Sequence, residues 1–415
     1  MSSTKELSHW RFWPVFILAF FYPMNNGMIN LLVPIYYLQE GLYEGAIGVL
    51  SAGTTIAYVF SPLLLNKVSQ KIKRKTSIII SLTGVFLSEI IFYFTLNPIL
   101  FIISRTVEGI FMGLYWPNLQ SSISDNIFHE HRKLTAKYNI SWNLGILGGF
   151  LLGALLLFIF ELLEIIFYIA PILIFINLII AIGAFQEPKK INIHSKEFKE
   201  YIKKKKLNLV KAVKIKEEKD DFTKISFPLI FPVLLVIGYC LPRAAINFLY
   251  PLKSELLNFE PYTVYIAIFF LALSQMISMI FASLMKLRRF NKIPPIMIGI
   301  LVLIFPIIAL NQEFLIFIIL FLIIGSCTGI LYGVSLRLFL ILNMKENKSI
   351  YSAFLESILG LVFLITPILS GVIAAIDLNI TFYLLTSILV ILFFVLLILS
   401  IKKVNFEVNE KENVE

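Results

Sequence analysis

Charge is scarce in this sequence. Only 15% of its 415 residues are charged, whereas 58% are hydrophobic and the mean hydropathy is +0.86. Soluble domains carry about 25% charged residues, so this composition excludes an ordinary water-soluble protein. Apolar runs of about 20 residues, the length that a helix needs to cross a bilayer, recur along the whole chain. The sequence therefore predicts a membrane protein with many crossings.

Residues that build cross-links and metal centres are scarce as well. The two cysteines, Cys240 and Cys327, fall in the middle of apolar runs, so no disulfide framework is indicated. The four histidines lie in polar segments, and "HEHR" is a weak metal-binding pattern. The chain has no glycine-rich nucleotide-binding loop, which argues against transport driven by its own ATP hydrolysis. We expect no metal and no cofactor.

Aspartate is rare enough to bear on the alternative of a polytopic membrane enzyme. Prenyl-transfer enzymes of this size need aspartate-rich metal motifs at the membrane face. The four aspartates are scattered, so the sequence favours a protein that is not an enzyme. They are Asp125, Asp220, Asp221 and Asp377.

Twelve membrane-crossing helices are predicted. The apolar runs are too long and continuous for the strands of a membrane β-barrel, so helices are the remaining solution. We expect crossings at residues 12–38, 45–65, 77–96, 99–121, 138–160, 165–185, 227–251, 262–285, 294–311, 314–342, 350–376 and 380–401.

The distribution of Lys and Arg predicts the orientation. Nearly all of the 36 basic residues fall on the side shared by both termini. The exceptions are Lys253, expected in a loop on the opposite side, and Arg105 and Arg243, expected within helices. By the positive-inside rule both termini are cytoplasmic, in a multi-pass protein of the plasma (cytoplasmic) membrane. The net charge of +10 is then a topology signal and predicts no nucleic-acid partner.

One long hydrophilic stretch divides six helices from six. It contains "YIKKKKLNLVKAVKIKEEKDD", which suits either a helix lying on anionic membrane lipids or a solvated tether. The expected parts are an N-terminal six-helix bundle over 1–185, a basic cytoplasmic linker over 186–226, a C-terminal six-helix bundle over 227–401 and a cytoplasmic tail over 402–415.

The two halves repeat each other. "INLLVPI" in the first run and "INFLYPL" in the seventh place Asn30 against Asn247 and Pro34 against Pro251, both 217 residues apart (247 − 30). "GIFMGL" in the fourth run and "GSCTGI" in the tenth keep nearly the same offset. A duplicated six-helix unit explains the constant offset. Two parallel repeats joined by a linker are typical of transporters, with the substrate site near the midplane between them.

The segment "RTVEGIFMGLYWP" (Arg105 to Pro117) resembles the helix-4 signature of the major facilitator superfamily, and the resemblance covers nearly the whole chain. After the second run, "NKVSQKIKRK" is similar to the superfamily's gating loop at Lys71, Arg74 and Lys75, but lacks its glycines and aspartate. The fifth run is glycine-rich without the Gly-Pro pair of many drug/proton antiporters. The resemblance implies an all-α membrane protein of twelve transmembrane helices in two pseudo-symmetric six-helix bundles.

Arg105 and Glu108 are the first candidates for a functional pair. They lie one helical turn apart in the fourth crossing, and a charge inside a membrane is costly. Glu108 can hold a coupling proton, or the two residues can form a permanent ion pair that makes the helix insertable. Glu356 in the eleventh crossing is the second proton-coupling candidate. Glu89 is weaker, because the superfamily places the third helix at the periphery.

Polar residues of the first and seventh crossings are candidates for a substrate-binding surface. Arg243 follows a proline midway along the seventh crossing, and the matching part of the first is "PMNNG". Amides and arginines there can face a cavity. For a single asparagine, hydrogen bonding to a neighbouring helix is the favoured role, but the repeated placement of these residues favours a shared polar surface. The predicted substrate-binding residues are Asn25, Asn26, Asn30, Arg105, Arg243, Asn247 and Gln275.

These features predict a proton-coupled secondary active transporter that moves a small solute by alternating access. The substrate is a polar or anionic metabolite, or an amphipathic drug that is exported. A non-transporting sensor on the same fold is the alternative, ahead of a membrane enzyme. The expected partners are a small-molecule substrate, H⁺ or another coupling ion, and membrane lipids, with the protein a monomer.

Overall fold

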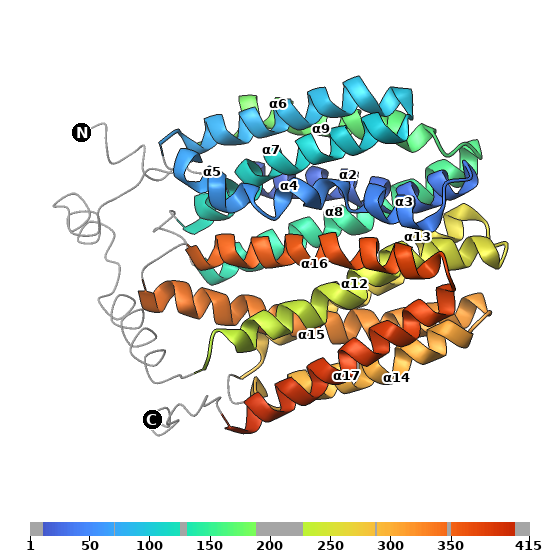
Figure 1. Cartoon of the computed structure of the whole chain (residues 1–415). Helices are drawn as coiled ribbons and strands as arrows, with labels where there is room; N and C mark the ends of the chain where they lie inside the picture. Colours follow the sequence, from blue (N-terminus) through green and yellow to red (C-terminus); the bar gives the residue numbers. More distant parts are fainter. Residues whose placement is uncertain are drawn as a thin grey trace, which may run out of the picture.

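The structure is a bundle of long helices that run side by side (Figure 1). It is a computed structural model that describes residues 11–69, 71–124, 131–187, 227–286, 289–346 and 350–402. Within these ranges eleven helices are long and apolar enough to cross a membrane, and no strand is present. The predicted linker over 186–226 and the tail over 402–415 lie almost wholly outside the described residues.

The helices follow the apolar runs, and most of their ends match the predicted crossings to within a few residues. The fifth helix begins earlier than predicted, and the seventh and tenth end later. The long helices are α2 (Trp13–Gln39), α6 (Arg74–Phe92), α7 (Pro98–Ser124), α8 (His131–Phe160), α9 (Ile165–Gly183), α12 (Ile230–Leu256), α13 (Pro261–Leu284), α14 (Ile293–Leu310), α15 (Phe314–Glu346), α16 (Ile350–Ala374) and α17 (Leu378–Lys402), with a short 3-10 turn, η1 (Tyr93–Thr95), after α6.

The second predicted crossing is not one continuous helix. It is divided into α3 (Glu44–Ser51), α4 (Gly53–Tyr58) and α5 (Ser61–Ser69), which follow one another along the bundle (Figure 1). At the first break the Ala52 carbonyl accepts the Thr55 hydroxyl at 2.7 Å together with the backbone N–H groups of Thr55 and Ile56, at 2.9 and 3.2 Å. Near the second break Pro62 cannot donate a backbone hydrogen bond. The crossing expected over 45–65 is therefore made of three short helices in succession.

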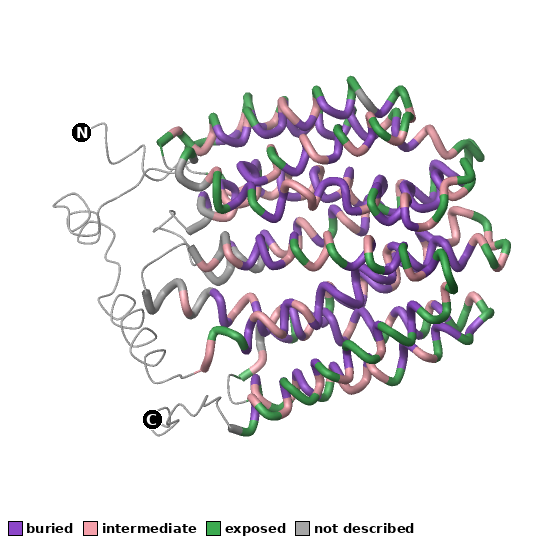
Figure 2. Tube along the Cα trace, viewed as in Figure 1, coloured by how far each residue is buried: buried purple, intermediate pink, exposed green. Residues whose placement is uncertain are grey.

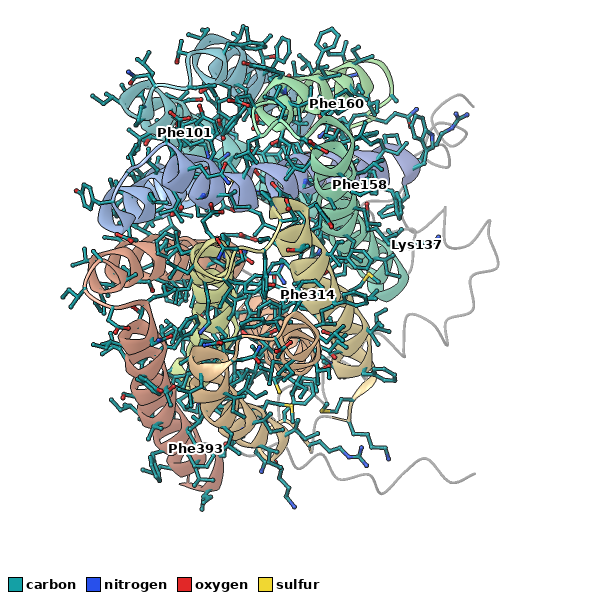
Figure 3. All side chains as sticks on the ribbon, turned by 90° about the vertical axis from the view of Figure 1, so that its right-hand side faces the viewer. Phe101, Lys137, Phe158, Phe160, Phe314 and Phe393 are labelled. Atoms are coloured by element: carbon teal, nitrogen blue, oxygen red, sulfur yellow. The ribbon has the colours of Figure 1, made fainter. Side chains whose placement is uncertain are left out.

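The helices form two groups. Helices α2 to α9, the N-terminal bundle, lie above helices α12 to α17, the C-terminal bundle (Figures 1 and 3). Nearly three quarters (72%) of the most apolar stretch of α12 is buried, against 28% in α17, so α12 is central and α17 peripheral. Figure 2 shows the same contrast, with exposed residues along the outer helices. Exposed apolar side chains such as Ile391 and Phe394 suit contact with lipid.

Lys253 is not in a loop, contrary to the sequence prediction. Helix α12 continues to Leu256, so Lys253 lies in its last turn and is buried. Its ammonium donates to the Ala309 carbonyl and to Asn379 Oδ1, and lies 5.7 Å from the centre of the Phe382 ring. These partners replace water and let a lysine end a helix inside the protein.

The two bundles are closed against each other at the end opposite the described termini. Helix α8 packs on α13, and α16 packs on α3. Gly48 and Gly371 face each other there, and a methyl group at Gly48 would collide with the Pro367 carbonyl. The ends of α2 and α12 also meet, where Gln39 Nε2 lies 3.4 Å from the Glu255 carboxylate. Small residues allow this close approach.

A bulky residue at Gly48 should hold this end open. We expect Gly48→Val to lengthen the distance between spin labels placed through Gln39→Cys and Glu255→Cys, measured by pulsed electron paramagnetic resonance. Both native cysteines are buried, which limits labelling elsewhere. Gly183→Val is the control, because nothing lies within 4 Å of a methyl group there. An unchanged distance in Gly48→Val would contradict this closure.

Candidate functional site

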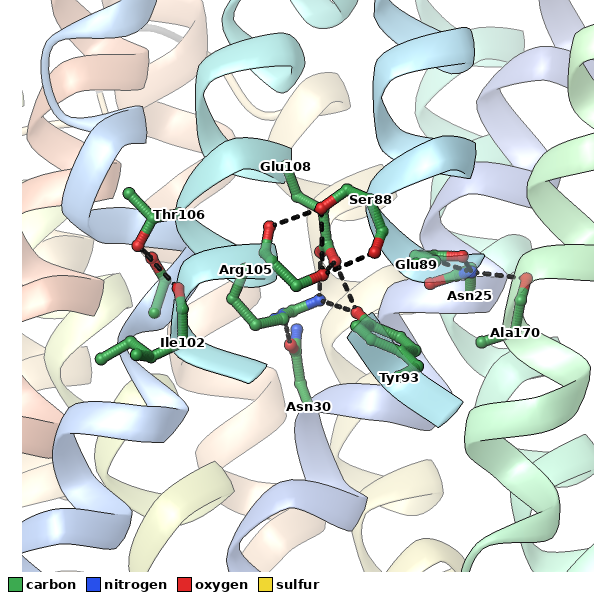
Figure 4. Close-up of polar contacts among 12 residues, drawn as sticks. Asn25, Asn30, Ser88, Glu89, Tyr93, Ile102, Arg105, Thr106, Glu108 and Ala170 are labelled. Carbon is green, nitrogen blue, oxygen red and sulfur yellow. Dashed lines mark hydrogen bonds and ion pairs between the residues drawn. The ribbon is translucent and has the colours of Figure 1, made fainter. Parts of the chain in front are cut away.

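A buried ion pair lies at the centre of the N-terminal bundle (Figure 4). Arg105 Nη1 lies 2.7 Å from Glu108 Oε2, one turn away on α7. The other oxygen of Glu108 accepts hydrogen bonds from the Tyr93 hydroxyl at 2.7 Å and the Ser104 hydroxyl at 3.2 Å. Both charged side chains are only 2% exposed. Every charged oxygen therefore has a donor, as burial of a carboxylate requires.

The guanidinium links this pair to an accessible residue of helix α2. Arg105 Nη1 also donates to the Tyr93 hydroxyl at 3.1 Å, and Nη2 donates to Asn30 Oδ1 at 2.6 Å. The Arg105 Nε atom is buried without a partner among the described residues. Asn30 lies midway along the central helix α2 and yet is exposed. The arginine thus connects a dry interior to an accessible asparagine.

Close packing of α4 on α7 makes this burial possible. Gly109 allows the Thr54 carbonyl to approach so closely that a methyl group would not fit. The Ser61 hydroxyl, at the break between α4 and α5, donates to the Gly109 carbonyl at 2.8 Å. Gly53 lies against the stem of Arg105 in the same way. The breaks in the second crossing let the chain follow α7 and cover the ion pair.

Asn25 is directed into the N-terminal bundle rather than toward the other bundle. Its side-chain amide donates to the Glu89 carboxylate at 3.1 and 3.3 Å and to the Ala170 carbonyl at 2.8 Å (Figure 4). It therefore ties α2 to α6 and α9, which is the helix-bridging role that the sequence left open. Glu89 is 1% exposed, so this carboxyl is inside the bundle and not on its lipid face. Asn26 is half-buried.

Arg243 is a buried cation of the C-terminal bundle. Its Nη1 donates to Gln275 Oε1 at 3.0 Å, and its guanidinium lies 5.8 Å from the centre of the Phe150 ring. Phe150 belongs to α8, so Arg243 lies where the two bundles meet. The side chain is 4% exposed and has no carboxylate partner within the described ranges. Asn247, one turn further along α12, has a buried Oδ1 without a partner in those ranges.

The Glu356 side chain connects the two bundles. Its carboxylate accepts a hydrogen bond from the Tyr58 hydroxyl at 2.8 Å and one from Gln120 Nε2 at 3.0 Å. Tyr58 and Gln120 lie on α4 and α7, whereas Glu356 lies on α16. The rings of Tyr239 and Tyr332 in the C-terminal bundle have centres 4.5 Å apart. Both phenols are near enough to interact electrostatically with the Glu356 carboxylate. No basic side chain pairs with Glu356 in the part of the chain that the structure describes.

The predicted gating residues lie at the opposite end of the N-terminal bundle from the closed surface. The Glu187 carboxylate, after α9, accepts the backbone N–H groups of Arg74 and Lys75 at 2.8 and 2.9 Å. The Lys75 ammonium donates to the Ile182 carbonyl at 2.7 Å, and Lys71 is exposed. An acidic residue thus caps the first turn of α6, a position that favours negative charge.

Several partners of the predicted residues were missed from the sequence. Ser104 had a signal, since it precedes Glu108 by four residues and so shares its helical face. Tyr93, Gln120 and Phe150 had none, because an aromatic or amide residue in an apolar run is usually only packing. The structure brings Asn30, Arg105 and Glu108 together, and it brings Arg243 to Gln275. It does not unite these two sets in direct contact.

Two bundles of membrane-crossing helices, with charged side chains buried in and between them, define a polytopic membrane transporter. The chain belongs to the Major Facilitator Superfamily, whose family model matches residues 15–310. It is therefore a multi-pass membrane protein and a non-enzymatic transporter of a small solute. The prediction of the family and of its all-helical fold is confirmed.

Solved structures support the same fold. The chain is similar to the nucleoside transporter NupG, with a TM-score of 0.68 at 16% identity over 94% of this chain and 98% of that one. It is also similar to the human organic anion transporter MFSD10, with a TM-score of 0.63 at 14% identity over 93% of this chain and 98% of that one. No curated protein matches the sequence.

The charge of Arg105 makes Glu108 necessary for stability. We expect Glu108→Ala to lower the free energy of unfolding by about 3–5 kcal/mol, because it leaves a buried cation uncompensated. Thermal unfolding of the purified protein in detergent measures the loss. The double variant Arg105→Leu, Glu108→Ala should recover part of it, because the charge is removed with its partner. Equal losses in Glu108→Ala and in the exposed Glu40→Ala would refute the pair's contribution.

Proposed function

We propose that this chain is a proton-coupled secondary active transporter of a small anionic metabolite. The two bundles rock against each other, so that their contact surface is open in turn to the two sides of the membrane. The basic residues favour a cytoplasmic membrane with both termini inside. The closed end in the structure is then the outer end, and the described conformation is one that is shut to the outside.

Arg243 is the observation that supports an anionic substrate. Removing a full charge from water costs several kcal/mol even after the protein relaxes. The hydrogen bond from the charged guanidinium to the Gln275 oxygen contributes about 1.5–3 kcal/mol, and the buried contact with the Phe150 ring contributes about 2 kcal/mol, but neither partner supplies a negative charge. The uncompensated positive charge of Arg243 therefore favours a ligand that is negatively charged. Because Phe150 covers the guanidinium from the other bundle, such a ligand would contact both bundles, as alternating access requires.

Neighbouring polar atoms are consistent with a ligand that also has hydroxyl or amide groups. Asn247 Oδ1 and Arg105 Nε are buried without a partner among the described residues, one acceptor and one donor on opposite bundles. Asn30 is accessible beside Arg105. The similar structures include a nucleoside transporter and an organic anion transporter, so the fold alone does not identify the substrate class. Arg243 favours the anion over the amphipathic drug.

Of the two predicted proton-coupling carboxyls, Glu356 supports coupling more strongly than Glu108. Glu108 already has Arg105 as its counter-ion. Within the described ranges Glu356 has a phenol and an amide as its partners, both from the opposite bundle, so its negative charge is poorly compensated where it is buried. We infer that a proton on Glu356 neutralises this charge and loosens its contacts with Tyr58 and Gln120 when the bundles separate.

The substrate class can be tested by uptake into proteoliposomes with labelled carboxylates, phosphorylated metabolites, nucleosides and cationic amphiphiles. We expect flux of an anion, and a large loss of that flux in Arg243→Gln, which keeps the bulk but not the charge. Arg337→Gln is the matched control, since Arg337 is an arginine bonded to the Met285 carbonyl and the Phe290 ring inside one bundle. Flux confined to nucleosides or cationic amphiphiles would contradict the anionic substrate.

Proton coupling can be tested with Glu356→Gln. We expect this variant to lose accumulation of substrate driven by an imposed pH gradient, while it still equilibrates substrate down its own gradient, because glutamine cannot release a proton. The exposed Glu260→Gln is the control. Wild-type accumulation by Glu356→Gln would remove Glu356 from the coupling step.

A further inference from the structure

Among the described residues, the N-terminal bundle buries two carboxyls, Glu89 and Glu108, and one cation, Arg105. Glu89, Arg105 and Glu108 are 1%, 2% and 2% exposed, and all three lie in or beside the cluster of Figure 4. The charges of Arg105 and Glu108, both on α7, act on the Glu89 carboxyl. With both carboxyls ionised the cluster would carry one uncompensated negative charge in an apolar interior. A single proton makes the cluster neutral.

Hydrogen bonding decides which carboxyl takes the proton. Glu108 accepts from Arg105, Tyr93 and Ser104, so donors surround its charged form. Among the described residues, the one donor to Glu89 is the Asn25 amide nitrogen, which lies 3.1 and 3.3 Å from its two oxygens. The orientation of Asn25 is fixed, because the same nitrogen donates to the Ala170 carbonyl. Donors to an ionised carboxylate favour ionisation, which leaves Glu108 charged.

The other elements packed around Glu89 bring no second cation among the described residues. Helix α9 contributes the Ala170 carbonyl, and α2 contributes the Asn25 amide. The turn η1 contributes Tyr93, whose hydroxyl already donates to Glu108. The positive charge that reaches Glu89 is that of Arg105, which is committed to Glu108 at 2.7 Å.

We propose that Glu89 carries an exchangeable proton in this bundle, while Glu108 stays ionised as the partner of Arg105. This inference rests on the proposed transport function and names a further coupling residue for it, in addition to Glu356. When the proton leaves the Glu89 carboxyl, a carboxylate forms and the cluster changes from neutral to singly negative. That state needs a new counter-charge for Glu89, which Arg105 can supply only by weakening its contact with Glu108 or Asn30.

Infrared spectroscopy of the purified wild-type protein tests where the proton lies, without any transport assay. We expect a protonated-carboxyl C=O stretching band that is lost in Glu89→Gln. Asn25→Ala should shift this band, because it removes the hydrogen bond to Glu89. Ser104→Ala is the matched control, since it removes a donor to Glu108 and should leave the band in place. A band that is unchanged in Glu89→Gln, or that shifts in Ser104→Ala and not in Asn25→Ala, overturns the assignment.

Stability gives a second test. Glu89→Gln resembles the protonated side chain and should unfold at nearly the wild-type temperature, whereas Glu108→Gln should unfold at a lower one. The reverse order would place the proton on Glu108 and overturn the proposal. In proteoliposomes Glu89→Gln should lose substrate accumulation driven by a pH gradient. If no compound is transported by wild-type protein, the transport proposal fails, while the infrared band still decides the location of the proton.

Discussion

The contact between Arg105 and Glu108 is the constraint around which the N-terminal bundle is built. An ion pair buried in an apolar interior is tolerated when hydrogen-bond partners satisfy most of its remaining polar atoms. Tyr93 and Ser104 supply them for the carboxylate, and Asn30 supplies one for the guanidinium. Packing that excludes water from the pair then requires α4 to lie against α7.

The second crossing meets that requirement by being broken. A straight helix would contact α7 at one crossing point, whereas three short segments can follow it, with the Thr54 carbonyl and the Ser61 hydroxyl against Gly109. The same segments carry Tyr58, which reaches Glu356 of the C-terminal bundle. Burial of the ion pair and contact between the bundles are thus built on one irregular element. A change in the ion pair can therefore alter the contact between the bundles, and a change in that contact can alter the ion pair.

Most of the fold follows from the sequence, because lipid imposes a simple rule on it. Each crossing needs about 20 apolar residues, and the positions of eleven long helices were predicted closely on that basis. Two features were not predicted. The breaks near Ala52 and Pro62 fall in a run that also contains small and polar residues, and no single residue type there marks them. Lys253 is held inside by Ala309, Asn379 and Phe382, which are distant in sequence.

The sequence by itself determined the family, the crossings and the pairing of Arg105 with Glu108, because residues three apart on a helix must lie side by side. Only the tertiary structure decided that Asn25 binds Glu89, that Arg243 lies beneath Phe150, and that Glu356 is held by the opposite bundle. The physical reason is that an apolar helix can pack against almost any other apolar helix. The partners of its few polar residues are chosen by how all the helices pack together, which no local pattern records.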